Sequence, residues 1–259
     1  MRSPLAFILA AACPCIAARA TIVNIDFSAG LAPVTYTGQA AAADPAGSAA
    51  VWNAIGRDGT KDRVTQDPLM DSSGVPTSIA LSLGINGSHA SVDGDLERSG
   101  GYDALMSDYV FVNSGSSALV TTSTGIISGL GANNAYDLYF YAQGDSFTGN
   151  VYAGQNSLFT LGGVSRQTSW DGLSGGDGSL EEGTEYVKFT VFADAGGQIE
   201  FQWSNVVAGV NADADADGLA SRYAGFNALQ IVQNPNAVPE VSSALLAAIG
   251  ALALLRRRR

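Results

Sequence analysis

Three carboxylates at alternating positions form the pattern in this sequence that is best suited to chemistry. Asp213, Asp215 and Asp217 are followed directly by Gly218. Oxygen ligands at this spacing, with a glycine that permits a tight turn, are typical of a loop that binds calcium. An EF-hand-like loop supplies a bidentate Glu at its twelfth position, which is Ala224 here. The motif therefore predicts either a calcium site that another segment must complete or a solvated acidic loop.

Carboxylates outside this motif are candidates for completing the metal site or for hydrolysis. The aspartates that could supply the missing calcium ligand are Asp93, Asp95 and Asp194. Glycoside hydrolysis needs two suitably spaced carboxylates. The nearest group to this requirement lies in a glycine-rich turn that leads into a strand: Glu181, Glu182 and Glu185. Solvated charge is expected in such a turn, so these residues give no specific signal for a catalytic pair.

Tryptophan is the residue type best suited to stacking on a sugar ring. Trp52 and Trp170 lie in loop-like sequence, and we predict them as sugar-stacking residues, with packing as the alternative. Trp203 alternates with polar residues in a strand-like run, which predicts a core position.

Composition excludes several kinds of catalysis. The two cysteines, Cys13 and Cys15, lie in an N-terminal apolar run, and a chain that loses this run has no disulfide or Cys nucleophile. His89 is the only histidine, which excludes a multi-histidine zinc site. The sequence contains neither a Gly-x-Ser-x-Gly elbow nor a Walker-type phosphate loop. We therefore predict a protein that is not an enzyme.

The charge balance excludes nucleic acid as a partner. The formal net charge is −11, and four of the thirteen basic residues are the terminal Arg256 to Arg259. A nucleic-acid binder needs positive charge to neutralise phosphates. An acidic body fits divalent-cation binding and solubility outside the cell instead.

Short strand-like runs separated by turn residues make up residues 21–232. Charged residues are only 14% of the chain and glycines number 31, which disfavours long helices. Strands are predicted over 21–27, 77–83, 108–112, 118–122, 125–128, 135–142, 157–161, 185–192, 198–203 and 226–232. Residues 38–72 are predicted as long loops. The pattern predicts an all-β domain, a jelly-roll-type β-sandwich whose first and last strands pair as neighbours.

Residues 1–20 have the three parts of a secretory signal peptide. Arg2 supplies a positive start, residues 4–17 form an apolar run, and Ala18 and Ala20 are the small residues before a cleavage site. We therefore predict export, with Thr21 as the mature N-terminus. Lipid modification of Cys13 is a less favoured alternative, because the usual upstream Leu is missing.

The C-terminal end predicts a short membrane segment. Residues 233–237 are predicted as a linker, and residues 241–255 as a short transmembrane helix. A full span usually takes about 20 residues, and snorkelling side chains or a thinner bilayer can close the gap. The basic cluster 256–259 resists translocation, so the body is expected outside the cytoplasm. A permanent anchor and a processed tail both fit this topology.

The tail, residues 238–259, resembles a PEP-CTERM sorting signal. The motif 238–243 departs from the usual pattern at Val241, where a second proline is expected. The matching residues are Val238, Pro239, Glu240, Ser242, Arg256, Arg257, Arg258 and Arg259. The resemblance implies recognition by an exosortase, a membrane-embedded protease. It also implies transfer of the body to the cell surface or to extracellular polysaccharide.

Two strand patterns are similar to galactose-binding-like, carbohydrate-module sandwiches: residues 136–141 and 226–231. With the tail, this predicts an exported, non-enzymatic surface or extracellular-matrix protein that is held transiently in the inner membrane and binds polysaccharide. One alternative is a secreted carbohydrate-active enzyme that uses Asp and Glu. Another is a purely structural component of a surface layer.

Overall fold

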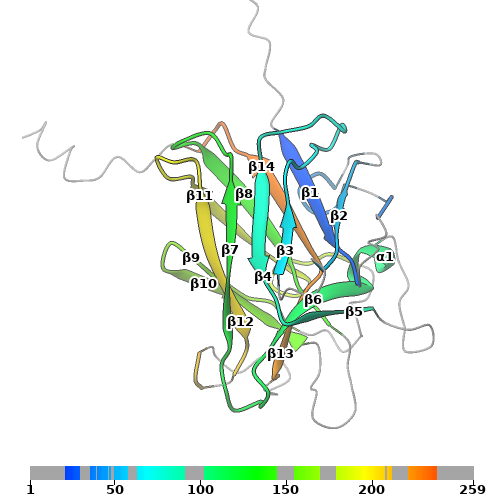
Figure 1. Ribbon diagram of the computed structural model, residues 1–259, viewed down its shortest axis with the longest axis vertical. Helices are drawn as coiled ribbons and strands as arrows, with labels where there is room; N and C mark the ends of the chain where they lie inside the picture. The colour runs from blue at the N-terminus through cyan, green and yellow to red at the C-terminus, as the bar shows by residue number, and fades with distance from the viewer. Residues whose placement is uncertain are drawn as a thin grey trace, which may run out of the picture.

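β-strands arranged in three sheets account for nearly all the regular structure that is described (Figure 1). The computed structural model describes residues 21–29, 36–38, 40–45, 47, 50–57, 63–90, 102–144, 155–169, 179–207, 209–211 and 221–237. The all-β prediction is confirmed at this level. One short helix, α1 (Asp103–Met106), is present among these residues.

Two large sheets and one small sheet contain the strands. The five-stranded sheet has the order β11 (Tyr186–Phe192), β8 (Ala135–Tyr141), β14 (Ala228–Gln233), β1 (Ile22–Phe27) and β2 (Asn53–Ile55). The six-stranded sheet has the order β10 (Val164–Gln167), β9 (Ser157–Leu161), β12 (Ile199–Asn205), β7 (Thr122–Ser128), β4 (Ala80–Gly84) and β3 (Arg63–Gln66). The three-stranded sheet has the order β13 (Tyr223–Phe226), β6 (Asp108–Asn113) and β5 (Gly87–Ala90).

The main core lies between the inner faces of the two large sheets. Side chains alternate between the two faces of a strand, so every second residue of β8 and β12 points inward. Phe140 of β8 is fully buried, and its ring centre lies 4.6 Å from that of Phe159 and 5.0 Å from that of Phe201, both in the six-stranded sheet. Trp203 is also fully buried here, as predicted.

The first and last strands pair as predicted. β1 and β14 are antiparallel neighbours, with Asn24 opposite Gln230. The backbone N–H of Gln233 donates to the carbonyl of Thr21 at 3.0 Å, so the two ends of the described body lie side by side. The predicted linker 233–237 is bound to the sheet, because Asn234 N–H donates to the carbonyl of Ala135.

The remaining differences from the predicted strands have local causes. Residues 118–121 are not a strand, because Asn205 accepts from Thr121 N–H and donates to the carbonyl of Leu119. The predicted strand 226–232 breaks at Asn227. Its side chain accepts from Gln143 N–H and donates to the carbonyl of Met106, so the chain passes from the small sheet to the large one.

The sequence prediction also missed four short strands. β2 and β3 lie within 38–72, where loops were predicted, and β5 and β10 contain only four residues each. These segments are too short and too polar to show a clear alternation.

The membrane segment gains no support from the described residues. None of the helices among them has the length and the apolar character needed to cross a membrane. The signal peptide 1–20 and the tail 238–259 lie outside the described residues, so both stay predictions.

Removing the Phe140 ring is expected to destabilise the fold. Phe140→Ala leaves a cavity between the two sheets and should lower the free energy of unfolding by about 3–5 kcal/mol. Phe192→Ala is the matched control, since that ring is 40% exposed at the end of β11. Urea denaturation followed by tryptophan fluorescence measures both variants. Equal losses for the two would contradict the placement of the core.

Candidate functional site

The structure gives a mixed result for the residues singled out in the sequence. Asp213, Asp215, Asp217 and Trp170 lie outside the described residues, as do Asp93 and Asp95. The calcium prediction therefore stays a prediction. Within the described residues, no group of three His, Cys, Asp or Glu side chains is placed to hold a metal ion. Asp194 shapes a turn, where its Oδ1 accepts from Gly196 and Gln198 N–H.

Trp52 is a packing residue in this structure. Its side chain is only 3% exposed, and it contacts Tyr36 edge to face with ring centres 5.3 Å apart. A buried indole presents no ring face to a sugar, so the structure favours the packing alternative over stacking. Both residues belong to a second core on the outer face of the five-stranded sheet, together with Ala41, Leu105, Met106, Tyr141 and Ala228.

A buried amide network attaches this second core to the sheet. Gln230 of β14 donates to Asn24 Oδ1 at 2.8 Å and to the carbonyl of Ala40 at 2.6 Å. Tyr141 donates its hydroxyl hydrogen to Gln230 Oε1, and that hydroxyl accepts from Ala42 N–H. Each of these polar groups is buried with a partner, which makes the network stabilising rather than costly. It holds the segment 40–45 against β1 and β14.

Asp26 lies at the edge of this network and is only 1% exposed. Its Oδ2 accepts from Tyr36 N–H at 2.8 Å, and its Oδ1 has no partner among the described residues. Burial raises the pKa of Asp26 from 3.8 to about 8, although the Tyr36 bond opposes the shift and the nearby Asp108 carboxylate adds to it. A largely protonated carboxyl is therefore expected near neutral pH.

The other half of the same face, over β8 and β11, carries half-buried aromatic rings. Tyr139 and Tyr186 come from adjacent strands, and their ring centres are 5.9 Å apart with planes inclined at 41°. Lys188 lies opposite Tyr139, with its Nζ 5.1 Å from the ring centre. We call this region, defined by Tyr139, Tyr186, Lys188, Asp137 and Thr190, the β11 surface.

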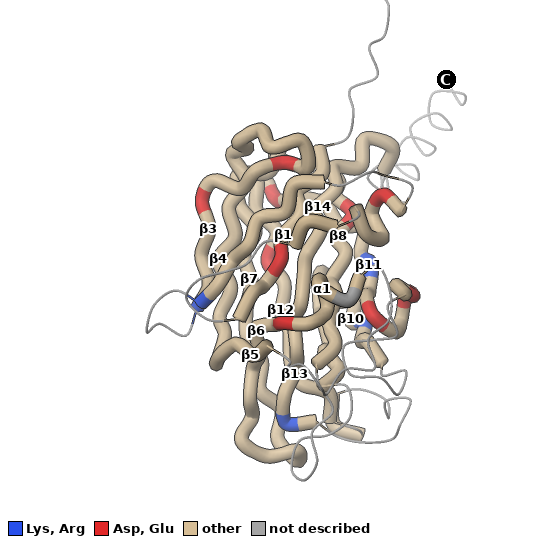
Figure 2. Tube along the Cα trace, turned by 90° about the vertical axis from the view of Figure 1, so that its right-hand side faces the viewer, with Lys and Arg blue, Asp and Glu red and all other residues tan. Residues whose placement is uncertain are grey.

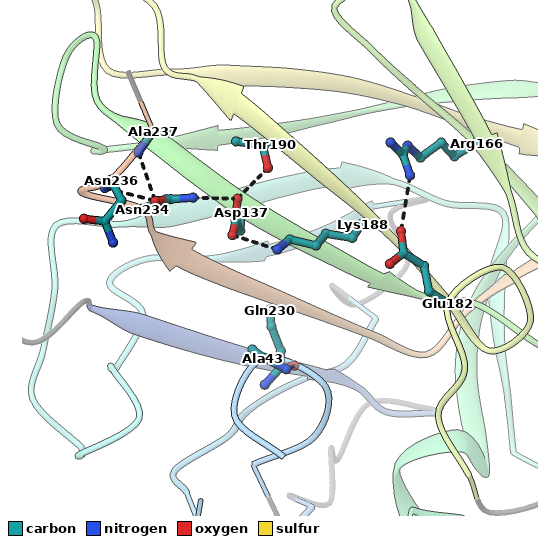
Figure 3. A network of polar contacts seen from close by, with 10 residues as sticks. All are labelled: Ala43, Asp137, Arg166, Glu182, Lys188, Thr190, Gln230, Asn234, Asn236 and Ala237. Atoms are coloured by element: carbon teal, nitrogen blue, oxygen red, sulfur yellow. Dashed lines mark hydrogen bonds and ion pairs between the residues drawn. The ribbon is translucent and has the colours of Figure 1, made fainter. Parts of the chain in front are cut away.

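An ion pair fixes the polar side of the β11 surface (Figure 3). Lys188 Nζ lies 2.9 Å from Asp137 Oδ2, while Thr190 and Asn234 donate to Asp137 Oδ1 at 2.6 and 3.1 Å. Burial alone raises the pKa of Asp137, but these bonds and the Lys188 charge outweigh it and leave the pKa below its usual value. Burial lowers the pKa of Lys188, and its bonds to Asp137 and Tyr139 more than reverse this. Both side chains are therefore charged at neutral pH.

A groove of about 540 Å³ lies beside the β11 surface, where the edge strands of the two large sheets meet. It is lined by Arg166 and Gln167 of β10, by Glu182 and Gly183 of the turn before β11, and by Val187 of β11. Arg166 Nη1 lies 3.2 Å from Glu182 Oε1, so a second ion pair spans the groove (Figure 3). Burial and the Glu182 charge both raise the pKa of Tyr186, which keeps its hydroxyl neutral.

A second groove, of about 430 Å³, lies at the end of the body where residues 21 and 233 meet. Thr77, Asn134 and Gln233 give it a polar lining. Among its described lining residues the one aromatic is Tyr136, which is 5% exposed and uses its hydroxyl to accept from Gly131 N–H. It therefore offers hydrogen bonds without an open ring, whereas the β11 surface offers both.

The arrangement of the β11 surface suits a ligand with an apolar ring face and many hydroxyl groups. Tyrosine rings provide a flat apolar contact, and the charged and hydroxyl groups beside them can donate and accept hydrogen bonds. These residues were not among the predicted site residues, because the aromatic run of 135–142 was predicted only as a strand. Their positions on adjacent strands become clear only from the register of β8 and β11.

Comparison with known proteins reveals only distant similarity. No family model matches this chain, and no curated protein is similar to it in sequence. The ANXUR1 extracellular domain from Arabidopsis thaliana matches with a TM-score of 0.37 and 12% identity, over 67% of this chain and 55% of that one. The plant receptor-like kinase ANX2 matches with a TM-score of 0.37 and 11% identity, over 68% of this chain and 55% of that one. The plant receptor-like kinase FER matches with a TM-score of 0.33 and 12% identity, over 83% of this chain and 42% of that one. The chain thus spans about half the length of these structures, and TM-scores below 0.5 transfer neither a fold nor a function.

Asp26 should make stability depend on pH. Because its pKa is raised from 3.8 to about 8 on folding, the folded chain keeps a proton that the unfolded chain loses between these values. Its contribution to stability is therefore complete below about pH 4 and is lost as the pH rises to about 8. Asp26→Asn should stabilise the protein relative to the wild type at pH 8 more than at pH 4.5, as measured by urea denaturation.

The matched control for this experiment is Asp67→Asn, which changes an exposed carboxyl in the same way. Identical pH profiles for the wild type and Asp26→Asn would show that the buried carboxyl does not titrate as described.

Proposed function

We propose that this chain is an exported, non-enzymatic surface or extracellular-matrix protein that binds polysaccharide through the β11 surface. The observation that carries the proposal is the pair of half-buried rings, Tyr139 and Tyr186, beside the Lys188–Asp137 ion pair. Sugar rings present apolar C–H faces and hydroxyl edges, which match the two kinds of group on this surface. Rigid neighbouring strands hold both tyrosines, so little entropy is lost on binding.

We further assign the body to the jelly-roll type of β-sandwich. The face-to-face packing of the two large sheets supports a sandwich, and the pairing of β1 with β14 is typical of jelly rolls. Such a body places groups on rigid strand faces as well as on loops, which suits recognition of a long polymer.

The proposed route to the surface uses the signal peptide 1–20 and the PEP-CTERM-like tail 238–259, with an exosortase-type protease as partner. The position of the body's ends supports this route. Thr21 and Gln233 are hydrogen-bonded neighbours, so both predicted sorting segments attach at one end of the body. A membrane tether at that end leaves the faces of the sheets accessible.

Loss of either tyrosine ring should weaken polysaccharide binding. The full chain, in a detergent without a sugar head group, is screened against a panel of polysaccharides, and affinities are measured by calorimetry. Tyr186→Ala and Tyr139→Ala should each weaken binding by about tenfold or more, since each removes a stacking contact of about 1.5 kcal/mol. Tyr186→Phe keeps the ring and should bind nearly as well as the wild type.

The control for location is Leu119→Ala, a 58% exposed residue between β6 and β7. Unchanged affinity in both tyrosine-to-alanine variants would exclude the β11 surface as the site. Release of reducing ends from a bound polysaccharide would instead favour the alternative, a carbohydrate-active enzyme.

Processing at both ends should be visible in the native protein. Mass spectrometry of the protein from its own host should give a mature N-terminus at Thr21 and a C-terminus near Pro239, because both sorting segments are removed. An intact chain of 259 residues recovered from the cytosol would contradict export.

A further inference from the structure

The three-stranded sheet carries a second group of aromatic side chains, on the face away from the main core. Alternation in β6 and β13 places Val110, Val112, Ala224 and Phe226 in the core. The opposite parity places Phe111 and Tyr223 on the outer face, where both are half-buried. Tyr109 has the same parity but is only 1% exposed, so it cannot contact a ligand directly.

Gly87 lets the Phe111 ring lie against the sheet. Phe111 pairs with Gly87 on one side and with Gly225 on the other. A Cβ atom at Gly87 would lie 2.5 Å from Phe111 Cζ, so a larger residue there would displace the ring. Tyr223 meets Phe111 edge to face, with ring centres 5.3 Å apart. The two ring planes are inclined at 76°, so together they form an apolar corner.

Arg222 adds a positive charge to this corner. Its guanidinium carbon lies 4.9 Å from the centre of the Tyr223 ring, and its Nη2 donates to the Tyr223 hydroxyl at 3.1 Å. In Figure 2 a blue segment, the colour of Lys and Arg, lies below the β13 label, and the red segments of Asp and Glu lie above it. No carboxylate among the described residues forms an ion pair with Arg222.

Such an arginine is unusual in a chain with a net charge of −11. Acidic residues outnumber basic ones, and charge pairing among the described residues does not account for Arg222. The guanidinium presents five N–H donors in a plane, and stacking on Tyr223 keeps that plane in place. A planar carboxylate is the group that this fork binds best, through two parallel hydrogen bonds.

We propose that Arg222, Tyr223 and Phe111 form a second ligand site, which binds a uronic-acid unit of an acidic polysaccharide. Arg222 binds the carboxylate, and the rings of Tyr223 and Phe111 contact the apolar face of the sugar. The site lies on the three-stranded sheet, apart from the β11 surface on the five-stranded sheet, and does not depend on sugar binding there.

The test compares an oligogalacturonate with a neutral galacto-oligosaccharide of the same length, by calorimetry with the full chain in a detergent without a sugar head group. The acidic ligand should bind at low salt, and Arg222→Gln should weaken it by about tenfold or more. Arg222→Lys should recover only part of the affinity, because an ammonium lacks the planar fork. Phe111→Leu should also weaken binding, since it removes one ring.

Arg63→Gln is the matched control, because Arg63 is an exposed arginine on β3 of the six-stranded sheet. Arg222→Gln should lower the affinity for oligogalacturonate but not the affinity for a polysaccharide that binds the β11 surface, which separates this proposal from that one. Thermal melting of each variant shows that it folds. Equal losses in the Arg222 and Arg63 variants, or equal binding of the acidic and neutral ligands, would overturn the proposal. Equally tight binding of a sulfated neutral oligosaccharide would overturn the assignment to a carboxylate.

Discussion

The position of β14 between β8 and β1 is the constraint on which the rest of the structure depends. This last strand is buried on both faces, with Leu229 and Ile231 in the core between the sheets and Gln230 in the amide network outside. Its pairing with β1 brings residue 21 beside residue 233, at the two ends of the described body. Without it, β8 would have β11 as its one neighbour in this sheet, and the two strands would not be joined to β1.

The outer face of the five-stranded sheet is divided into two parts by the kind of polar group it carries. Over β1 and β14, Asn24 and Gln230 are fully buried and donate to the carbonyls of Val51 and Ala40, so hydrogen bonds to water are replaced by hydrogen bonds within the fold. Over β8 and β11, tyrosines and an ion pair remain partly accessible. One face therefore provides both a structural attachment and a surface available to a ligand.

The two proposed sites lie on different sheets of one rigid body. A long polymer that contacts both pays the cost of association once, and its second contact forms at a high effective concentration. This would allow two weak sugar contacts to give firm attachment to a matrix. The division of chemistry is also consistent, since the β11 surface carries a paired lysine and the three-stranded sheet carries Arg222, which has no ion-pair partner among the described residues.

Much of the strand structure was readable from the sequence, because alternation with a period of two is a local property of each strand. The bounds of β1, β6, β8, β9 and β11 were predicted to within one or two residues. The pairing of the first and last strands was also predicted. The absence of cysteine after residue 15 and the acidic balance are likewise properties of the sequence itself. The prediction of loops over 38–72 was wrong because β2 and β3 form by pairing with β1 and β4, which lie outside that segment.

The sites were decided by tertiary structure. Trp52 and Tyr186 are both aromatic residues near turns, yet Trp52 is buried within the second core while Tyr186 packs against that core and stays only half-buried. Nothing local distinguishes them, since burial is set by which segments cover a face. The ring of Tyr139 contacts that of Tyr186, and the ring of Phe111 contacts that of Tyr223. These residues are separated by 47 and 112 positions in the sequence, and the register of the strands brings them together.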